Sequence, residues 1–169
     1  HDSRVGSFAV ITFSLLFLLK INALTTISVS MRRPALLLMP VISRWFIVIF
    51  AYVYPTASSS KLGKSFITYL SSKHIIMSTV LSAAVSISIS YYYNLSYYFI
   101  FAIISLSLLI IALFTVSINK KLGGLTGDIY GAITEITEVL ILIILIAVEG
   151  VIWQDGEIAE VWSCSKGAG

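Results

Sequence analysis

The sequence has few charged residues and little of what proteins use for covalent or metal cross-links. Only 11% of its 169 residues are charged, and it contains one cysteine and two histidines. The single cysteine, Cys164, excludes an internal disulfide framework, and the separation of His1 from His74 argues against a zinc site of the usual histidine–cysteine type. The sequence also lacks a basic face with interleaved aromatic residues, so nucleic acid is not an expected partner.

Apolar residues dominate the chain. The hydrophobic fraction is 58% and the mean hydropathy is +0.98, far above the values of a soluble domain. We therefore expect an integral membrane protein in contact with the lipid bilayer, with an all-α fold: a polytopic helical bundle of about five transmembrane helices. The predicted spans are residues 5–24, 34–54, 74–91, 95–118 and 129–153. Residues 1–153 would form one membrane core, and the polar residues 154–169 a disordered tail.

Two basic residues fall within the predicted spans. Lys20 lies near the far end of the first span, where its long side chain can reach the membrane surface. Arg44 lies at the midpoint of the second span, just after Pro40, which is expected to kink the helix. Either Arg44 faces the interior and meets an anion or a carboxylate, or this segment is short or re-entrant and Arg44 lies at an interface.

A basic, glycine-rich loop leads into an acidic helix at residues 120–138. At about 100° per residue, four carboxylates fall within a narrow arc of the last predicted helix: Asp128, Glu135, Glu138 and Glu149. A charge at the centre of a bilayer costs about 2.5–3.5 kcal/mol on insertion scales. We therefore expect this acidic stripe to face the interior of the bundle or a water-filled cavity.

The distribution of basic residues predicts which side of the membrane carries the site. With five spans, the amino-terminal entry and the connections around Lys64 and Lys121 share a side, which holds the excess of lysine and arginine and should be cytoplasmic. Carboxylates, cations and backbone donors gathered there at a glycine loop before a helix suit a phosphate bound with Mg²⁺. For the lysines, the alternative is that they simply flank the spans.

Two stretches of the sequence resemble a known family. Residues 2–8 (DSRVGSF) and 122–132 (LGGLTGDIYGA) are similar to signature stretches of adenosylcobinamide-GDP ribazoletransferase, also called cobalamin synthase. Ser43-Arg44 and residues 62–66 (LGKSF) are in register with weaker features of that family. The resemblance extends from Asp2 to about Trp153.

The resemblance implies a magnesium-dependent transferase of the bacterial inner membrane. Such an enzyme joins adenosylcobinamide-GDP to α-ribazole or its 5′-phosphate, gives adenosylcobalamin or its phosphate, and releases GMP. Its chemistry resembles that of CDP-alcohol phosphotransferases, in which a hydroxyl attacks a phosphoanhydride and a nucleotide leaves. A homo-oligomer is an open possibility.

Charge and position then suggest roles for individual residues. Asp2 and Asp128 are expected as metal ligands or substrate-orienting acids, and Glu135 as a further catalytic acid or a partner for Arg44. The residues expected to contact phosphate are Arg4, Arg44, Lys64, Gly124, Thr126 and Gly127.

The sequence departs from the family in ways that leave other interpretations open. The chain begins at His1 and lacks the family's Gly-Gly-Leu-His-x-Asp-Gly stretch, the expected main metal and catalytic site, and Ala9 replaces a common glycine. We therefore expect a fragment that has lost its beginning, and an inactive fragment is one alternative. Another is a small transporter or channel subunit in which the acidic stripe lines an ion path.

Overall fold

The computed structural model describes residues 7–54 and 70–166, and the side chains of residues 10–54, 70–121 and 123–149. Over these residues the secondary structure is helical, as predicted. The helices are α1 (Ser7–Thr26), α2 (Val29–Val53), α4 (Ser72–Tyr92), α5 (Tyr97–Leu122) and α6 (Gly127–Lys166). Within the described part of the chain, four stretches are long and apolar enough to cross a membrane, namely Val29–Val53, Ser72–Tyr92, Tyr97–Lys121 and Gly127–Glu149, and Val10–Thr26 is a shorter apolar helix.

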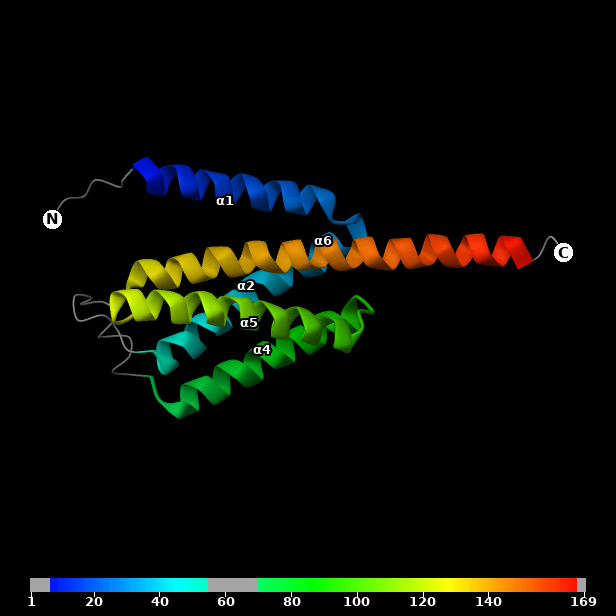
Figure 1. Ribbon diagram of the computed structural model, residues 1–169. Helices are drawn as coiled ribbons and strands as arrows, with labels where there is room; N and C mark the ends of the chain where they lie inside the picture. Colours follow the sequence, from blue (N-terminus) through cyan, green and yellow to red (C-terminus); the bar gives the residue numbers. More distant parts are fainter. Residues whose placement is uncertain (1–6, 55–69, 167–169) are drawn as a thin grey trace.

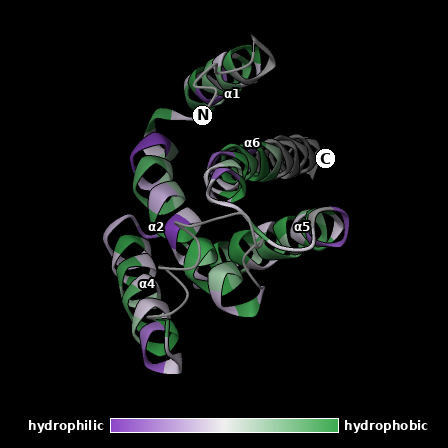
Figure 2. Ribbon diagram, turned by 90° about the vertical axis from the view of Figure 1, so that its left-hand side faces the viewer, coloured by the Kyte–Doolittle hydropathy of each residue, from purple (hydrophilic) through white to green (hydrophobic). Residues whose placement is uncertain are grey.

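The five helices run alternately in opposite directions (Figure 1). The loop between α5 and α6 therefore lies at the same end of the bundle as the start of α1 and the start of α4; we call this the glycine-loop end. Seen end-on, α6 lies between α1, α2 and α5, and α4 packs against α2 and α5 (Figure 2). Helix α6 is thus the central element, which explains why it is the most buried of the candidate spans.

The buried core lies where α2, α5 and α6 meet. Its largest fully buried side chains include Ile42 and Phe46 of α2, Ile111 of α5, and Ile133 and Ile141 of α6. On α6 these positions recur at helical spacing, so one apolar stripe faces α2 and α5 while the acidic stripe faces elsewhere. The carboxylates of Glu135 and Glu138 on α6 are thereby directed toward α1 and toward the middle of α2.

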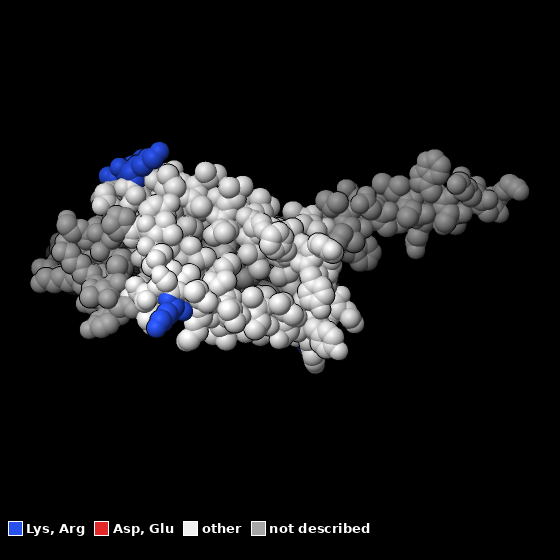
Figure 3. All heavy atoms as spheres, turned by 90° about the horizontal axis from the view of Figure 1, so that it is seen from below, with Lys and Arg blue, Asp and Glu red and all other residues white. Residues whose placement is uncertain are grey.

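The outer surface of the bundle suits hydrocarbon. Among the described residues of the face in Figure 3, no acidic side chain is seen and the few basic side chains lie toward one end. Large apolar side chains of α4 and α5 remain exposed, among them Met77, Val80, Phe101 and Leu113. In the span predicted at residues 95–118, only one side of α5 is exposed, because Ile103 and Ile111 are buried in the core.

The second helix starts earlier than the sequence predicted. We predicted a span that begins at residue 34, but α2 begins at Val29 and contains both Pro34 and Pro40. Ser28 supplies the reason, since its hydroxyl accepts a hydrogen bond from the N–H of Met31 and caps the helix. Because α2 continues unbroken to Val53, the interpretation of this segment as re-entrant is wrong.

The last helix continues beyond its apolar part. We expected the fifth span to end at Trp153, and the candidate span within α6 is Gly127–Glu149. Where we expected a disordered tail, α6 continues to Lys166 and extends beyond the other helices (Figure 1). The sequence from 127 to 166 contains no proline, the residue that most strongly breaks a helix, so nothing in the backbone chemistry ends α6 at Trp153.

Candidate functional site

A left-handed glycine shapes the loop that leads into α6. Gly123 closes α5 with a φ of 66°, and its N–H donates to the carbonyl of Asn119 at 2.9 Å. A residue with a side chain is disfavoured in this conformation, which accounts for a glycine here. Thr126 follows, and its carbonyl accepts the N–H groups of Ile129 at 3.1 Å and Tyr130 at 3.2 Å. The loop therefore delivers Gly127 as the first residue of α6 and Asp128 in its first turn.

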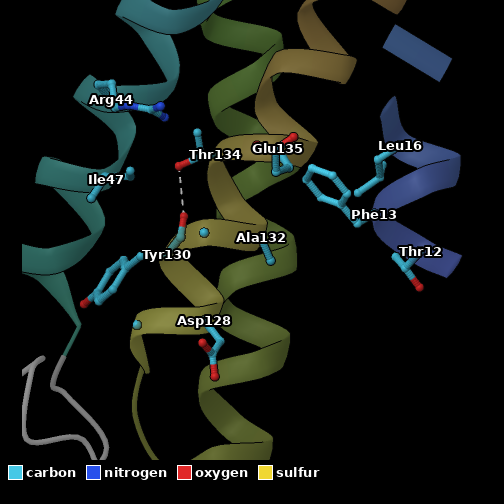
Figure 4. A pocket seen from close by; sticks show the side chains of 12 residues that line it. Thr12, Phe13, Leu16, Arg44, Ile47, Asp128, Tyr130, Ala132, Thr134 and Glu135 are labelled. Atoms are coloured by element: carbon cyan, nitrogen blue, oxygen red, sulfur yellow. Dashed lines mark hydrogen bonds between the residues drawn. The ribbon is translucent and has the colours of Figure 1, made fainter. Parts of the chain in front are cut away.

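A cavity of about 870 Å³ opens beside this first turn, between α1, α2 and α6. It brings together three charged residues that the sequence nominated, since Arg44, Asp128 and Glu135 all line it (Figure 4). The full lining is Thr12, Phe13, Leu16, Arg44, Ile47, Gly127, Asp128, Tyr130, Gly131, Ala132, Thr134 and Glu135. The cavity has an acidic floor on α6, a basic group on α2 and an apolar wall on α1.

The other nominated residues divide into three groups. Gly127 lines the cavity, whereas Gly124 and Thr126 do not. Gly124 is buried and Thr126 is half-buried in the preceding loop, so the structure gives them a place in shaping the loop. Asp2, Arg4 and Lys64 lie outside the described residues, and their roles stay predictions.

Two glycines keep the floor of the cavity open. A Cβ added at Gly127 or Gly131 would meet no atom within 4 Å. The two residues are four apart on α6, so they lie one above the other on the same face. Because neither glycine has a positive φ and neither touches a neighbour, packing does not explain them. Each instead leaves space beside the carboxylate of Asp128.

Below the cavity, Lys20 of α1 holds two carboxylates of α6. Its Nζ lies 2.6 Å from Oε2 of Glu135 and 2.7 Å from Oε2 of Glu138, and the side chain is only 13% exposed. We expected Lys20 to reach toward the membrane surface, and that prediction is wrong. The two glutamates are three residues apart on one face of α6, so a single ammonium group can serve both. In a low dielectric, the attraction between the ammonium group and the two carboxylates outweighs the hydration that Lys20 would gain at the membrane surface.

Arg44 contacts the same cluster more loosely. Its Nη1 lies 3.7 Å from Oε1 of Glu138, and the side chain is 63% exposed. The hydroxyl of Ser43 donates to the same Glu138 oxygen at 3.1 Å. We considered Glu135 as the partner of Arg44, but the ion pair is with Glu138. Arg44 thus faces the cavity with most of its hydrogen-bond donors available.

Sequence reasoning placed Glu138 on the acidic stripe but gave it no role. It is the most connected side chain of the cluster, with contacts to Lys20, Ser43 and Arg44. The three-residue spacing of Glu135 and Glu138 was the available signal, because two acids one turn apart inside a membrane need a shared cation.

The fourth acid of the stripe has a different function. Glu149 accepts the backbone N–H of Ser28 at 3.1 Å and its hydroxyl at 2.6 Å, at the opposite end of the bundle. A carboxylate at the start of α2 is favourable because the helix dipole is positive there. The stripe is therefore divided between a cavity residue, an ion-pair cluster and a helix cap.

The described residues provide only part of a metal site. Among them, no group of three or more histidine, cysteine, aspartate or glutamate side chains could hold a metal ion. Asp128 and Glu135 are separated by seven residues, about 10 Å along the helix axis, so they cannot share one ion. Asp128 is exposed in the cavity, and a Mg²⁺ ion is commonly held by one or two carboxylates together with substrate phosphates. Asp128 thus fits the role of a single protein ligand.

Comparison with known proteins identifies the family of the chain. The family model of cobalamin-5-phosphate synthase matches residues 1–146. A protein of Clostridium tetani named adenosylcobinamide-GDP ribazoletransferase is 32% identical over 146 residues, which cover 86% of this chain and 56% of that protein. The protein of the same name from Brevibacillus brevis is 33% identical over 146 residues, with 86% and 57% coverage.

The match covers only part of each relative. A third protein of that name, from Clostridium kluyveri, is 30% identical over 144 residues, which cover 85% of this chain and 56% of that protein. The chain therefore spans little more than half the length of these relatives. No solved structure matches it. With residues 1–146 matched by the family model, the chain belongs to the cobalamin-5-phosphate synthase family.

Proposed function

We propose that the protein is a membrane transferase that joins adenosylcobinamide-GDP to α-ribazole or its 5′-phosphate. The products would be adenosylcobalamin or its phosphate, and GMP. Support comes from the family match and from the printed names of the relatives. Because the chain covers 56% of the first of these relatives, the activity is proposed for the full-length protein that contains it.

The observation that carries the proposal is the placement of Asp128 and Arg44 in one cavity. A diphosphate substrate needs a cation to share its charge, and a guanidinium is suited to this because its planar fork matches phosphate oxygens. The first turn of α6 adds backbone N–H groups that have no acceptor within the helix. Gly127 and Asp128 belong to this turn and line the cavity, so the anion would meet both the helix terminus and Arg44.

In the proposed reaction, a hydroxyl of ribazole attacks the phosphorus that bears the cobinamide group. The new P–O bond forms as the anhydride P–O bond breaks, GMP leaves with the bonding electron pair, and the hydroxyl proton is lost. A bound Mg²⁺ ion would neutralise the diphosphate, and Asp128 is the described residue that would hold it. Arg44 would share the charge on the phosphate oxygens, and Glu135, fixed by Lys20, would orient groups at the floor of the cavity.

We propose a cytoplasmic active face for the same reasons of charge. Lys73 at the start of α4 and Lys120 and Lys121 at the end of α5 lie at the glycine-loop end, where the cavity opens. Arg32 and Arg33 lie at the start of α2, at the other end. An excess of basic residues favours the cytoplasmic side, which in a bacterium is the inner face of the cytoplasmic membrane.

The transporter alternative loses its main support. It required the acidic stripe to line an ion path, but Glu135 and Glu138 are paired with Lys20, and Glu149 caps α2. Three of the four acids are therefore engaged in contacts that hold helices together. Membership of a family of transferases points the same way.

The test is GMP release by the full-length protein in membranes. Wild-type protein should release GMP from adenosylcobinamide-GDP only when α-ribazole and Mg²⁺ are both present. Omitting either one serves as the control. GMP release that does not depend on α-ribazole would indicate hydrolysis instead of transfer and would contradict the proposal.

A further inference from the structure

We propose that Lys20 is a positioning residue that keeps the guanidinium of Arg44 available for an anion in the cavity. Lys20 does not line that cavity, so it would act only through the charge cluster beneath it. The inference deepens the proposed function, because it rests on Arg44 being the phosphate contact.

The carboxylate of Glu138 is shared unequally between two cations. Its Oε2 contacts Lys20 at 2.7 Å, a distance typical of a strong charge-assisted hydrogen bond. Its Oε1 receives the hydroxyl of Ser43 at 3.1 Å and lies 3.7 Å from Nη1 of Arg44. Lys20 and Ser43 thus satisfy most of this carboxylate, and Arg44 is steered by it without being tightly bound.

The division of close contacts within the cluster explains why Arg44 remains available. Two carboxylates, on Glu135 and Glu138, face two cations, on Lys20 and Arg44. Lys20 contacts both carboxylates, while Arg44 contacts one and leaves 63% of its side chain exposed. The close contacts to both carboxylates are therefore made by the lysine, and the guanidinium of Arg44, at 3.7 Å from Glu138, keeps hydrogen-bond donors free for an anion in the cavity.

Removing Lys20 would change where Arg44 points. The carboxylates of Glu135 and Glu138 would lose their close cation in a part of the protein with low dielectric, where unpaired charge is costly. Arg44 is the nearest remaining cation among the described side chains. Its Nη1 lies 3.7 Å from Oε1 of Glu138, and a charge-assisted hydrogen bond is about 2.7–2.9 Å long, so a shift of about 1 Å brings the two groups together. The guanidinium would then close onto Glu138 and be lost to the cavity.

The experiment measures the accessibility of Arg44 directly. Full-length protein in detergent or nanodiscs is treated with phenylglyoxal, which modifies accessible guanidinium groups, and each arginine is quantified by peptide mass spectrometry. In Lys20→Gln, modification of Arg44 should slow by about fivefold or more as it pairs with Glu138. Arg33, exposed at the far end of the bundle, is the internal reference and should be unchanged. Lys20→Arg preserves the cation and should behave as wild type.

A second variant guards against misfolding of the first. Lys20→Gln combined with Glu135→Gln removes one charge of each sign, which leaves Glu138 and Arg44 as a balanced pair. The inference predicts slow modification of Arg44 here too, since Glu138 no longer has a lysine. If phenylglyoxal modifies Arg44 at the wild-type rate in both variants, while the modification rate of Arg33 is also unchanged, the inference is overturned.

A kinetic measurement separates the inference from the proposed function. If the full-length protein turns over, Lys20→Gln should raise the KM for the GDP-bearing substrate by about tenfold and leave the KM for α-ribazole nearly unchanged, because Arg44 contacts only the anion. Equal effects on both KM values would overturn the inference. Absence of turnover in the wild type would count against the proposed function, while the phenylglyoxal result would still decide the role of Lys20.

Discussion

Lys20 of α1 and Glu138 of α6 are joined by an ion pair of 2.7 Å, although they are 118 residues apart in the sequence. Glu138 is the twelfth residue of the apolar part of α6 that runs from Gly127 to Glu149, so the pair lies near the middle of that span. It fastens the outermost helix to the central one and lies directly under the cavity that holds Arg44 and Asp128.

The first prediction concerns the stability that this pair provides. Lys20→Met leaves Glu138, which is 11% exposed, and Glu135, which is 35% exposed, without their close cation. Removal of one partner of a buried pair typically costs about 3–5 kcal/mol, and this cost applies to the pair with Glu138. The thermal unfolding midpoint in detergent should fall clearly. Adding Glu135→Gln to that variant should restore part of the loss, because one uncompensated charge is removed. A double variant no more stable than Lys20→Met would contradict this account.

Arg44 should matter for substrate binding and little for stability. Its side chain is 63% exposed and its ion pair is long, so Arg44→Gln should leave the unfolding midpoint nearly unchanged. Loss of hydrogen bonds to a charged group costs about 1.5–3 kcal/mol, so the KM for the GDP-bearing substrate should rise by about 10–100-fold. Arg33→Gln, at the opposite end of the bundle, is the matched control and should leave KM unchanged.

Gly131 should show opposite effects on stability and activity. Alanine is favoured over glycine within a helix by about 1 kcal/mol, and a Cβ at Gly131 meets no atom within 4 Å. Gly131→Ala should therefore raise the unfolding midpoint. The added methyl group enters the cavity, so GMP release should fall, and Gly131→Val should lower it further. Ser88→Ala, on the exposed side of α4, serves as the control for detergent effects.

Glu149 should contribute to stability only. It caps α2 through the N–H and the hydroxyl of Ser28, and loss of a helix cap typically costs about 1 kcal/mol. Glu149→Gln should lower the unfolding midpoint slightly and leave GMP release intact. A strong loss of activity in this variant, at a normal level of protein in the membrane, would mean that the whole acidic stripe is functional.

The contrast between Glu149 and Glu138 shows what could be predicted from the sequence. Apolar runs determine the helices, and helical periodicity put the four acids on one face of α6. The partners of those acids depend on how α1 and α2 are rotated about their axes, which apolar runs on lipid-facing helices do not determine. Lys20 and Ser28 were therefore assigned to the surface and to a connection, although both contact glutamates of α6.

The charged residues of the site could be predicted from the sequence, but its apolar residues could not. Asp128 and Arg44 were nominated because a charge within a membrane span is costly and usually has a functional role, and both line the cavity. The apolar wall from Phe13 and Leu16 went unnoticed, since these residues look like any others in an apolar helix.

GMP release by the full-length protein carrying Asp128→Ala tests the central claim most directly, namely that the cavity at the start of α6 is where transfer occurs. Asp128 is exposed and makes no ion pair with any described residue, so its loss should cost only the helix-dipole contribution of about 0.3–1 kcal/mol. The account predicts loss of at least about 100-fold in turnover at wild-type membrane levels, as expected for removal of a charge-stabilising group. Undiminished GMP release in this variant would contradict the account.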